Sequence, residues 1–215
     1  MGDFVYVPPQ GTPPVVYQDE DLLVVDKPAG LLSVPGRGAD KADSALTRIQ
    51  RQCGEALVVH RLDMATSGLL LFALNRKTQS YLGRLFSARR VFKAYEAIVE
   101  GLPGATTGVI ELPLASDWPN RPRQQVDWRR GKSAITRWEV MTRDRPSRTA
   151  RMRLLPVTGR SHQLRVHMQA LGHPIIGDEL YGGREALRLM LHATRLAFAH
   201  PRDGRTVVVE CTAPF

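Results

Sequence analysis

The residues best suited to chemistry lie in the stretch His60–Leu70 (HRLDMATSGLL), where a carboxylate follows a short apolar segment. Residues 56–59 before it and 68–74 after it are apolar runs typical of buried strands. An aspartate at such a place often only accepts hydrogen bonds from the next turn. Arg61, however, is a cation that would keep Asp63 ionised, and flanking apolar strands would keep water scarce. Asp63 is therefore the candidate nucleophile or base, with Arg61 as its candidate partner.

A second candidate is Arg165, in the stretch 158–171 (TGRSHQLRVHMQAL). This stretch begins with turn residues and predicts a helix with Ser161 as its N-cap. The apolar face of that helix is Leu164, Met168 and Leu171. Arg165 neighbours this face, and a partly buried arginine needs an anion. Asp63 is the economical partner, because a bidentate pair would orient the carboxylate and depress its pKa; a purely structural salt bridge is the alternative.

Metal and nucleotide motifs are missing from the sequence. His162 and His167 are five residues apart, so they do not share a helical face as two metal ligands would. The six histidines form no recognisable ligand set, and no glycine-rich phosphate loop is present. The chemistry is expected to need no metal and no cofactor.

The stretch Asp117–Lys132 (DWPNRPRQQVDWRRGK) combines two tryptophans with several cations. Its arginines are Arg121, Arg123, Arg129 and Arg130. Aromatic rings among arginines suit stacking on bases and pairing with phosphates. The stretch could equally be a hairpin whose tryptophans pack into the core, and both readings stay open here.

The charge balance indicates a polyanionic partner. Lys and Arg outnumber Asp and Glu by 30 to 21, and the pI is about 10.1. Residues 1–60 hold five basic and eight acidic side chains, so the positive excess follows them. Nucleic acid is the first expectation and an anionic membrane the second. Arg84, Arg89 and Arg90 cluster near one predicted helix end, where they either complement the helix dipole or contact phosphates.

The cellular setting follows from what the sequence lacks. No stretch approaches the roughly 20 apolar residues of a membrane span, and the N-terminus has no secretory pattern. Cys53 and Cys211 are isolated and are expected to be reduced thiols. A cytoplasmic protein is predicted.

The elements that must position the candidate residues are short strands and helices. Strands are predicted at 15–17, 22–25, 68–74, 92–99, 133–143, 149–155, 191–199 and 206–211. Helices are predicted from a cap at Asp43-Ser44 to about Gln52 and from the cap Asn75 to about Ala88. The proline-rich residues 1–14 predict an extended, poorly ordered arm, followed by one catalytic domain at 15–215.

The HRLD motif resembles that of the RluA family of pseudouridine synthases. Further blocks match in the same order: VVDKPAGLLSVPG, FKAYEAIVEG, TGRSHQLRVH, LGHPIIGDELYG and LHATRLAFAHP. The resemblance covers nearly the whole chain. It implies an α+β fold with a central mixed, mostly antiparallel sheet flanked by helices and loops. Many enzymes of this kind carry an extra N-terminal RNA-binding module, for which this chain has no room, so recognition is expected to fall to the catalytic domain. A monomer is expected.

The same resemblance assigns roles to individual residues. Asp63 matches the family's nucleophile, and Arg165 matches the arginine that pairs with it. Tyr95 matches the active-site tyrosine that stacks on the target uracil, although a lone strand tyrosine more commonly serves core packing. Arg61 matches the position that fills the gap left when the target base is flipped. Arg160 and His162, in the block around Arg165, are expected to bind substrate.

The expected function is isomerisation of uridine to pseudouridine in structured RNA. The chain looks most like the dual-specificity subfamily that acts on a 23S rRNA stem-loop and a tRNA anticodon stem-loop. Two alternatives remain open at this point. One is a non-catalytic RNA-binding module or RNA chaperone that uses the basic loop, and the other is a metal-free hydrolase that uses Asp63.

Overall fold

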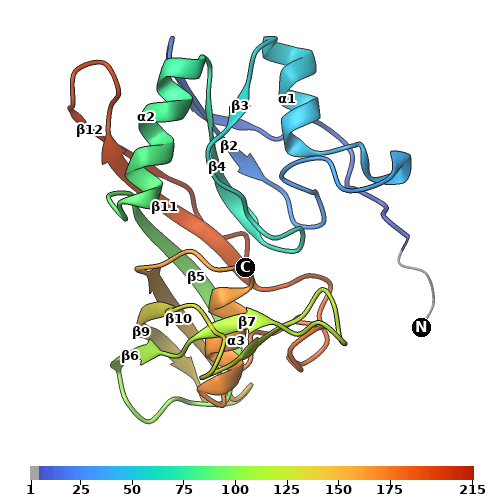
Figure 1. Ribbon diagram of the computed structural model, residues 1–215. Coiled ribbons are helices and arrows are strands. Elements are labelled where there is room, and N and C mark those ends of the chain that lie inside the picture. Colours follow the sequence, from blue (N-terminus) through green and yellow to red (C-terminus); the bar gives the residue numbers. More distant parts are fainter. Residues whose placement is uncertain (1–4) are drawn as a thin grey trace. The chain divides into compact units, whose positions relative to one another are not determined.

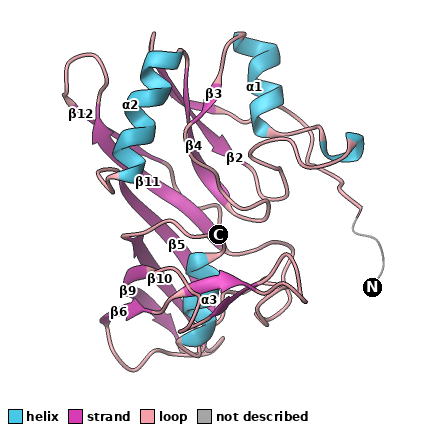
Figure 2. Cartoon of the chain, viewed as in Figure 1, coloured by secondary structure: helices cyan, strands magenta, loops and turns pink. Residues whose placement is uncertain are grey.

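The computed structural model describes residues 5–215 and divides the chain into two compact units. Unit 1 comprises Met1–Phe92 and Thr194–Thr212, and unit 2 comprises Lys93–Ala193 and Ala213–Phe215. Figure 1 labels the elements along the chain, and Figure 2 distinguishes the strands from the helices α1, α2 and α3. A single catalytic domain over residues 15–215 stays a prediction. Among the helices formed within residues 5–215, none is long and apolar enough to cross a membrane.

The strands of unit 1 follow the order β1-β2-β4-β11, with β3 paired to β4 and β12 paired to β11. Their bounds are β1 Val15–Gln18, β2 Leu22–Lys27, β3 Leu57–Val58, β4 Ser67–Ala73, β11 Leu191–Ala199 and β12 Thr206–Glu210. The first three residues of β11 belong to unit 2. Antiparallel pairing of β2 with β4 runs from Leu22 opposite Ala73 to Lys27 opposite Gly68. All residues of β4 are buried, which explains why its sequence is a continuous apolar run.

The two helices of unit 1, α1 (Ala45–Cys53) and α2 (Arg76–Ser87), begin at the predicted caps. Ser44 forms a capping box with Thr47, and Asn75 Oδ1 accepts from Thr78 N at 2.8 Å. The buried face of α2 joins a core with β2, β4, β11 and β12. The buried residues that α2 contributes to this core are Leu82 and Leu85. The predicted capping of both helices is confirmed.

The strands of unit 2 follow the order β5-β10-β9-β6, and β7 pairs separately with β8. Their bounds are β5 Phe92–Glu100, β6 Thr107–Glu111, β7 Leu114–Ser116, β8 Gln124–Val126, β9 Ile135–Asp144 and β10 Thr149–Pro156. The pairs β5–β10, β10–β9, β9–β6 and β7–β8 are antiparallel. The sequence predicted β5, β9 and β10 but not the short strands β6, β7 and β8.

Helix α3 (Gln163–Ala170) belongs to unit 2 and begins one residue later than predicted. Its N-cap is His162, which has a left-handed backbone (φ 53°) and makes no side-chain cap, so the predicted cap at Ser161 is wrong. The side chain of Gln163 closes this loop instead: its Oε1 accepts from Thr158 Oγ1 at 2.7 Å and from Arg160 N at 3.0 Å.

Residues 5–14 form no helix or strand, as expected of an extended arm. Two of these residues contact the rest of unit 1, and the order of the arm stays a prediction; Met1–Phe4 lie outside the described residues. The Tyr6 side chain is buried, donates to Asp43 O at 3.1 Å and accepts from Leu32 N at 2.9 Å. Arg48 also donates to Gly11 O.

Candidate active site

The turn that carries Asp63 connects β3 to β4 in unit 1, and its main chain is pinned on both sides of the aspartate. Leu62 exchanges two hydrogen bonds with the Ser33 hydroxyl, at 3.0 Å through its N–H and at 2.8 Å through its carbonyl. Met64 O accepts from Lys27 Nζ at 3.1 Å and from Gly30 N at 2.9 Å. The backbone around Asp63 is therefore held by residues 27–33, the segment that follows β2.

Lys27 is fully buried, and its ammonium group donates to three carbonyl oxygens. These belong to Leu31 at 2.7 Å, Pro28 at 2.9 Å and Met64 at 3.1 Å. Three charge-assisted hydrogen bonds offset the large cost of removing an ammonium ion from water. Gly30 has φ of 84°, a conformation that favours glycine and brings its N–H onto Met64 O. The lysine thus links the chain after β2 to the turn of Asp63.

Asp63 itself is half-buried, and its carbonyl accepts from Thr66 N at 3.1 Å to close the turn. Arg61 is exposed and forms no ion pair or hydrogen bond with the residues that the structure describes. The expected ion pair between Arg61 and Asp63 is therefore wrong in this structure. An exposed, unpaired Arg61 retains its full hydrogen-bonding capacity for a ligand.

Arg165 lies on α3 in unit 2 and is buried, with 5% of its surface exposed. Its Nε and Nη2 donate to the two carboxylate oxygens of Asp178, at 2.8 and 2.7 Å. This is the bidentate geometry that fixes a guanidinium plane. The sequence correctly predicted that a buried Arg165 needs an anion but missed Asp178 as its partner on the Nε–Nη2 edge. Pairing of Arg165 with Asp63 stays a prediction, since the two residues belong to different units.

Tyr181 connects Arg165 to the neighbouring loops of unit 2. It is buried, and its hydroxyl accepts from Gln124 N and meets His162 Nδ1, both at 2.7 Å. The Arg165 guanidinium lies 5.1 Å from the ring centroid of Tyr181. Asp178 Oδ1 also accepts from the backbone N–H of Tyr181 at 3.2 Å. The side chains of Arg165, Asp178 and Tyr181 therefore form a buried polar network, which the half-buried His162 joins. It contains two predicted site residues, Arg165 and His162.

The stretch 117–132 is a loop built around β8, and its tryptophans are on the surface. Trp118 is 68% and Trp128 75% exposed, so the alternative that they pack into the core is wrong. The Arg121 guanidinium lies 3.3 Å from the ring centroid of Trp118. Asp127 Oδ1 accepts from the backbone N–H groups of Arg129 and Arg130, at 2.8 and 2.9 Å. These two bonds lower the pKa of the Asp127 carboxyl. They involve only the backbone of Arg129 and Arg130, whose side chains are exposed.

The remaining predicted site residues of unit 2, Arg123, Arg160 and Tyr95, differ in burial and in their contacts. Arg123 is half-buried over the ring of Tyr181, 5.6 Å from its centroid, so it differs from the exposed arginines of the same loop. Arg160 is exposed, and its Nε donates to Ser133 O at 3.1 Å. Tyr95 is half-buried on β5, opposite Leu154 of β10.

Within residues 5–215, two groups of side chains come close enough to hold a cation. In one of them, Asp19, Asp21 and His200, the atoms already have partners: Asp19 Oδ2 accepts from Tyr17 at 2.6 Å and meets His200 Nε2 at 3.0 Å. This group serves the turn between β1 and β2.

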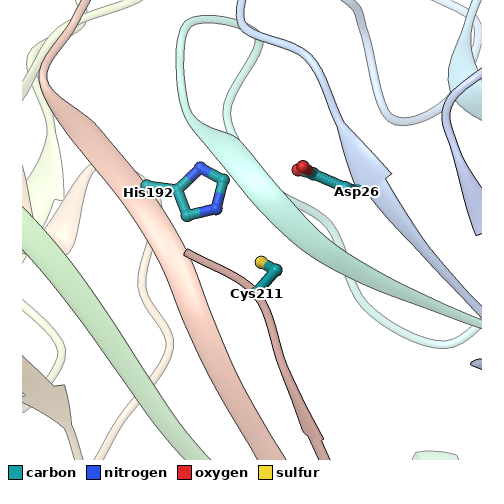
Figure 3. A group of neighbouring side chains, drawn as sticks. All are labelled: Asp26, His192 and Cys211. Carbon is teal, nitrogen blue, oxygen red and sulfur yellow. The ribbon is translucent and has the colours of Figure 1, made fainter. Parts of the chain in front are cut away.

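The other group is Asp26, His192 and Cys211, whose ligand atoms lie within 4.8 Å of one another (Figure 3). Burial, together with the negative charge of Asp26, raises the pKa of the Cys211 thiol to about 12. Burial and the charge of Arg188 lower the pKa of His192 to about 4. A thiol this weakly acidic disfavours the thiolate form that binds zinc. The group carries no metal assignment.

The comparisons with known proteins identify the family. Residues 21–170 match the family model described as RNA pseudouridylate synthase, a span that includes Asp63, Tyr95 and Arg165. The chain belongs to the RNA pseudouridylate synthase family.

Individual relatives of the same family match more than nine-tenths of the chain. The "Dual-specificity RNA pseudouridine synthase RluA" of Escherichia coli O6:H1 is 50% identical over 220 residues, covering 100% of both chains. The Vibrio cholerae protein of the same name is 49% identical over 203 residues, covering 92% of this chain and 82% of its own. The solved structure "Human RNA Pseudouridylate Synthase Domain Containing 1" has a TM-score of 0.81 at 32% identity, covering 97% of this chain and 87% of that one. The predicted pseudouridine synthase fold is confirmed.

Lys27, Asp178 and Tyr181 are the site residues that the sequence reasoning missed. All three lie in blocks that carried the resemblance, VVDKPAGLLSVPG and LGHPIIGDELYG. Their residue types give no separate signal, because a lysine, an aspartate or a tyrosine in a loop is ordinarily exposed. The sequence signal that could have found them is their place in blocks that match the family although no role was assigned to any residue of these blocks.

Proposed function

We propose that this protein isomerises uridine to pseudouridine in structured RNA, with Asp63 as the nucleophile. The observation that carries the proposal is the turn in which the main chain on either side of Asp63 is anchored, by Ser33 on one side and by Lys27 and Gly30 on the other. Fixed placement of a half-buried carboxylate is what nucleophilic attack on a bound nucleoside requires. Membership of the pseudouridylate synthase family supports the same reaction.

In the proposed reaction the Asp63 carboxylate attacks the flipped nucleoside, and the glycosidic bond to N1 of the uracil breaks. The detached uracil rotates, and its C5 forms the new bond to the sugar. The bond that Asp63 made in its attack breaks, which returns the free carboxylate. C5 then loses its proton and N1 gains one, so the product is an isomer of the substrate and needs no redox partner. Tyr95 stacks on the uracil and assists removal of the C5 proton. Arg165, oriented by Asp178, pairs with Asp63 and favours its ionised form.

The proposed substrate contacts come from exposed cations. Arg61 fills the space that the flipped base leaves in the RNA stack. Arg121, Arg129 and Arg130 pair with phosphates, and Trp118 and Trp128 beside them stack on unpaired bases. Arg160 and His162 complete the proposed substrate contacts, and Arg123 contributes from its half-buried position beside Tyr181.

The proposal extends to a ribosomal RNA stem-loop and a tRNA anticodon stem-loop as the two substrates. Two full-length relatives named dual-specificity RNA pseudouridine synthases support two substrate classes. We further propose a cytoplasmic monomer that works without a cofactor.

The test is release of tritium to water from RNA labelled at uracil C5. Wild-type protein should release tritium, and Asp63→Asn should abolish release while RNA affinity stays within about threefold, because phosphate contacts dominate affinity. Asp40→Asn, which changes an exposed aspartate of unit 1, is the control and should react as wild type. Turnover of Asp63→Asn within tenfold of wild type would contradict the assignment. A wild-type protein that binds RNA but releases no tritium would support the non-catalytic alternative.

A further inference from the structure

The C-terminal end of α2 lies beside the catalytic turn within unit 1. The rings of His60 and Phe86 stack with centroids 4.7 Å apart and an interplanar angle of 20°. His60 is also fixed on β4, because its Nε2 accepts from Leu71 N at 3.0 Å. Asp63 follows His60 by three residues, a reach of at most roughly 11 Å. Groups next to Phe86 are therefore close to RNA that places a uridine on Asp63.

Three arginines surround this end of α2: Arg84, Arg89 and Arg90. All are exposed, and none forms an ion pair with the residues that the structure describes. Helix α2 (RKTQSYLGRLFS) contains no acidic residue that could neutralise them. Several arginines elsewhere in the chain do have acidic partners: Arg153 with Glu139, Arg195 with Glu210, and Arg202 with Glu20 and Asp21. The end of α2 is thus a local concentration of uncompensated positive charge.

Arg89 occupies a backbone position that favours glycine. Arg89 N donates to Phe86 O at 3.1 Å and Arg90 N donates to Leu85 O at 2.8 Å, which is the hydrogen-bond pattern of a Schellman motif. In this motif the residue after the C-cap is left-handed, and Arg89 has φ of 58°. Such a conformation is unfavourable for a residue with a Cβ atom. An arginine at this position indicates a role for its side chain, since glycine would serve the turn better.

We propose that Arg84, Arg89 and Arg90 bind phosphates of the substrate RNA that flank the target uridine. This inference rests on the proposed function, because it assumes that RNA is bound at the turn of Asp63. Complementing the helix dipole does not account for the whole group: Arg84 lies in the last turn, but Arg89 and Arg90 lie beyond the helix. Three unpaired guanidinium groups next to a stacked, rigid anchor fit the regularly spaced charges of an RNA backbone.

The experiment compares two variants with a charge-matched control. The first variant is Arg89→Gly, and the second combines Arg84→Gln, Arg89→Gly and Arg90→Gln. The control combines Arg153→Gln, Arg195→Gln and Arg202→Gln, which removes the same net charge from arginines that already have acidic partners. Affinity for a substrate stem-loop is measured between 50 and 300 mM salt, alongside single-turnover tritium release at saturating protein and the melting temperature.

Each lost phosphate contact should reduce the log–log salt slope by about 0.7, equivalent to about fivefold in affinity at 0.1 M salt. Arg89→Gly should therefore weaken binding about fivefold and the triple variant about 100-fold, both with little change in the saturated rate. The melting temperature of Arg89→Gly should equal or exceed that of the wild type, because the left-handed position is relieved. The control should lose much less affinity than the triple variant.

The inference fails if wild-type protein is active but the triple variant keeps the wild-type salt slope, or loses no more affinity than the control. It also fails if the triple variant loses affinity only in proportion to lost folding stability. These outcomes leave the proposed function intact. Absence of tritium release by wild-type protein that binds RNA would instead overturn the proposed function, whatever the variants do.

Discussion

The substitution Asp178→Asn tests whether the buried network of unit 2 holds Arg165 in place. Asp178 is 1% exposed and its carboxylate accepts four hydrogen bonds, from Arg165 Nε and Nη2 and from the backbone N–H groups of Leu180 and Tyr181. An asparagine of the same shape can keep one oxygen facing Nη2 and the two backbone groups. Its amide NH2 group then replaces Oδ2 and faces the N–H of Arg165 Nε. Two donors meet there, and the hydrogen bond from Nε is lost.

The expected loss of stability follows from these contacts. The hydrogen bond from Nε to a charged acceptor contributes about 1.5–3 kcal/mol. Removing one charge of a buried ion pair typically costs about 3–5 kcal/mol in total. For a chain of this length about 2–4 °C of melting temperature corresponds to each kcal/mol, so a fall of roughly 6–20 °C is expected.

Urea unfolding and calorimetry of Asp178→Asn measure this effect, and Glu139→Gln is the matched control. Glu139 pairs with Arg153 across the surface, where the side chains are 48% and 43% exposed. Such exposed pairs contribute about 0–1 kcal/mol. If Asp178→Asn lost no more free energy of unfolding than Glu139→Gln, the ion pair with Asp178 would not be what holds the Arg165 side chain in its buried position. The proposed orientation of Arg165 by Asp178 would then be refuted.

Two further predictions concern other buried groups of unit 2. Tyr181→Phe should lower the free energy of unfolding by about 1–3 kcal/mol, because Gln124 N loses its acceptor, and should weaken RNA binding by the 117–132 loop. The control is Tyr81→Phe, because the Tyr81 hydroxyl bonds to no described residue. Equal effects of both variants on RNA binding would refute the coupling between Tyr181 and the loop. His192 has a folded pKa of about 4 against 6.5 unfolded, so the unfolded state binds more protons and stability should fall as pH drops from 6.5 to 4, by roughly 3 kcal/mol at most. In His192→Gln that part of the pH dependence of urea unfolding should disappear, and an unchanged profile would contradict it.

Local sequence patterns predicted those elements whose determinants are near in the chain. The caps Ser44 and Asn75 were identified because each bonds to a residue three positions away. The buried strand β4 was identified because its residues are apolar without interruption. Ser161 failed as a cap because Gln163 bonds to the preceding loop and makes a hydroxyl cap unnecessary.

The partners of the candidate site residues depend on contacts that are distant in the sequence. Lys27 reaches Met64 across 37 residues, and Tyr181 reaches Gln124 across 57. Neither periodicity nor propensity reports such pairs, since both describe one segment at a time. Arg165 shows the limit most directly. Its need for an anion was predictable from its neighbours, whereas the identity of that anion depended on how the loop after α3 returns.

The two buried cations, Lys27 and Arg165, each hold a group of the proposed active site in place. Burying a charge is expensive even when it is well paired, and replacing both members of a buried ion pair by apolar side chains of similar volume is often as stabilising. A methionine in place of Lys27 would fill the same space but leave Met64 O without its ammonium donor, beside the residue proposed as nucleophile. A leucine in place of Arg165 would similarly remove the group that Asp178 orients. Both cations therefore fix neighbouring groups: Lys27 holds the main chain next to Asp63, and Arg165 is held in a defined orientation by Asp178.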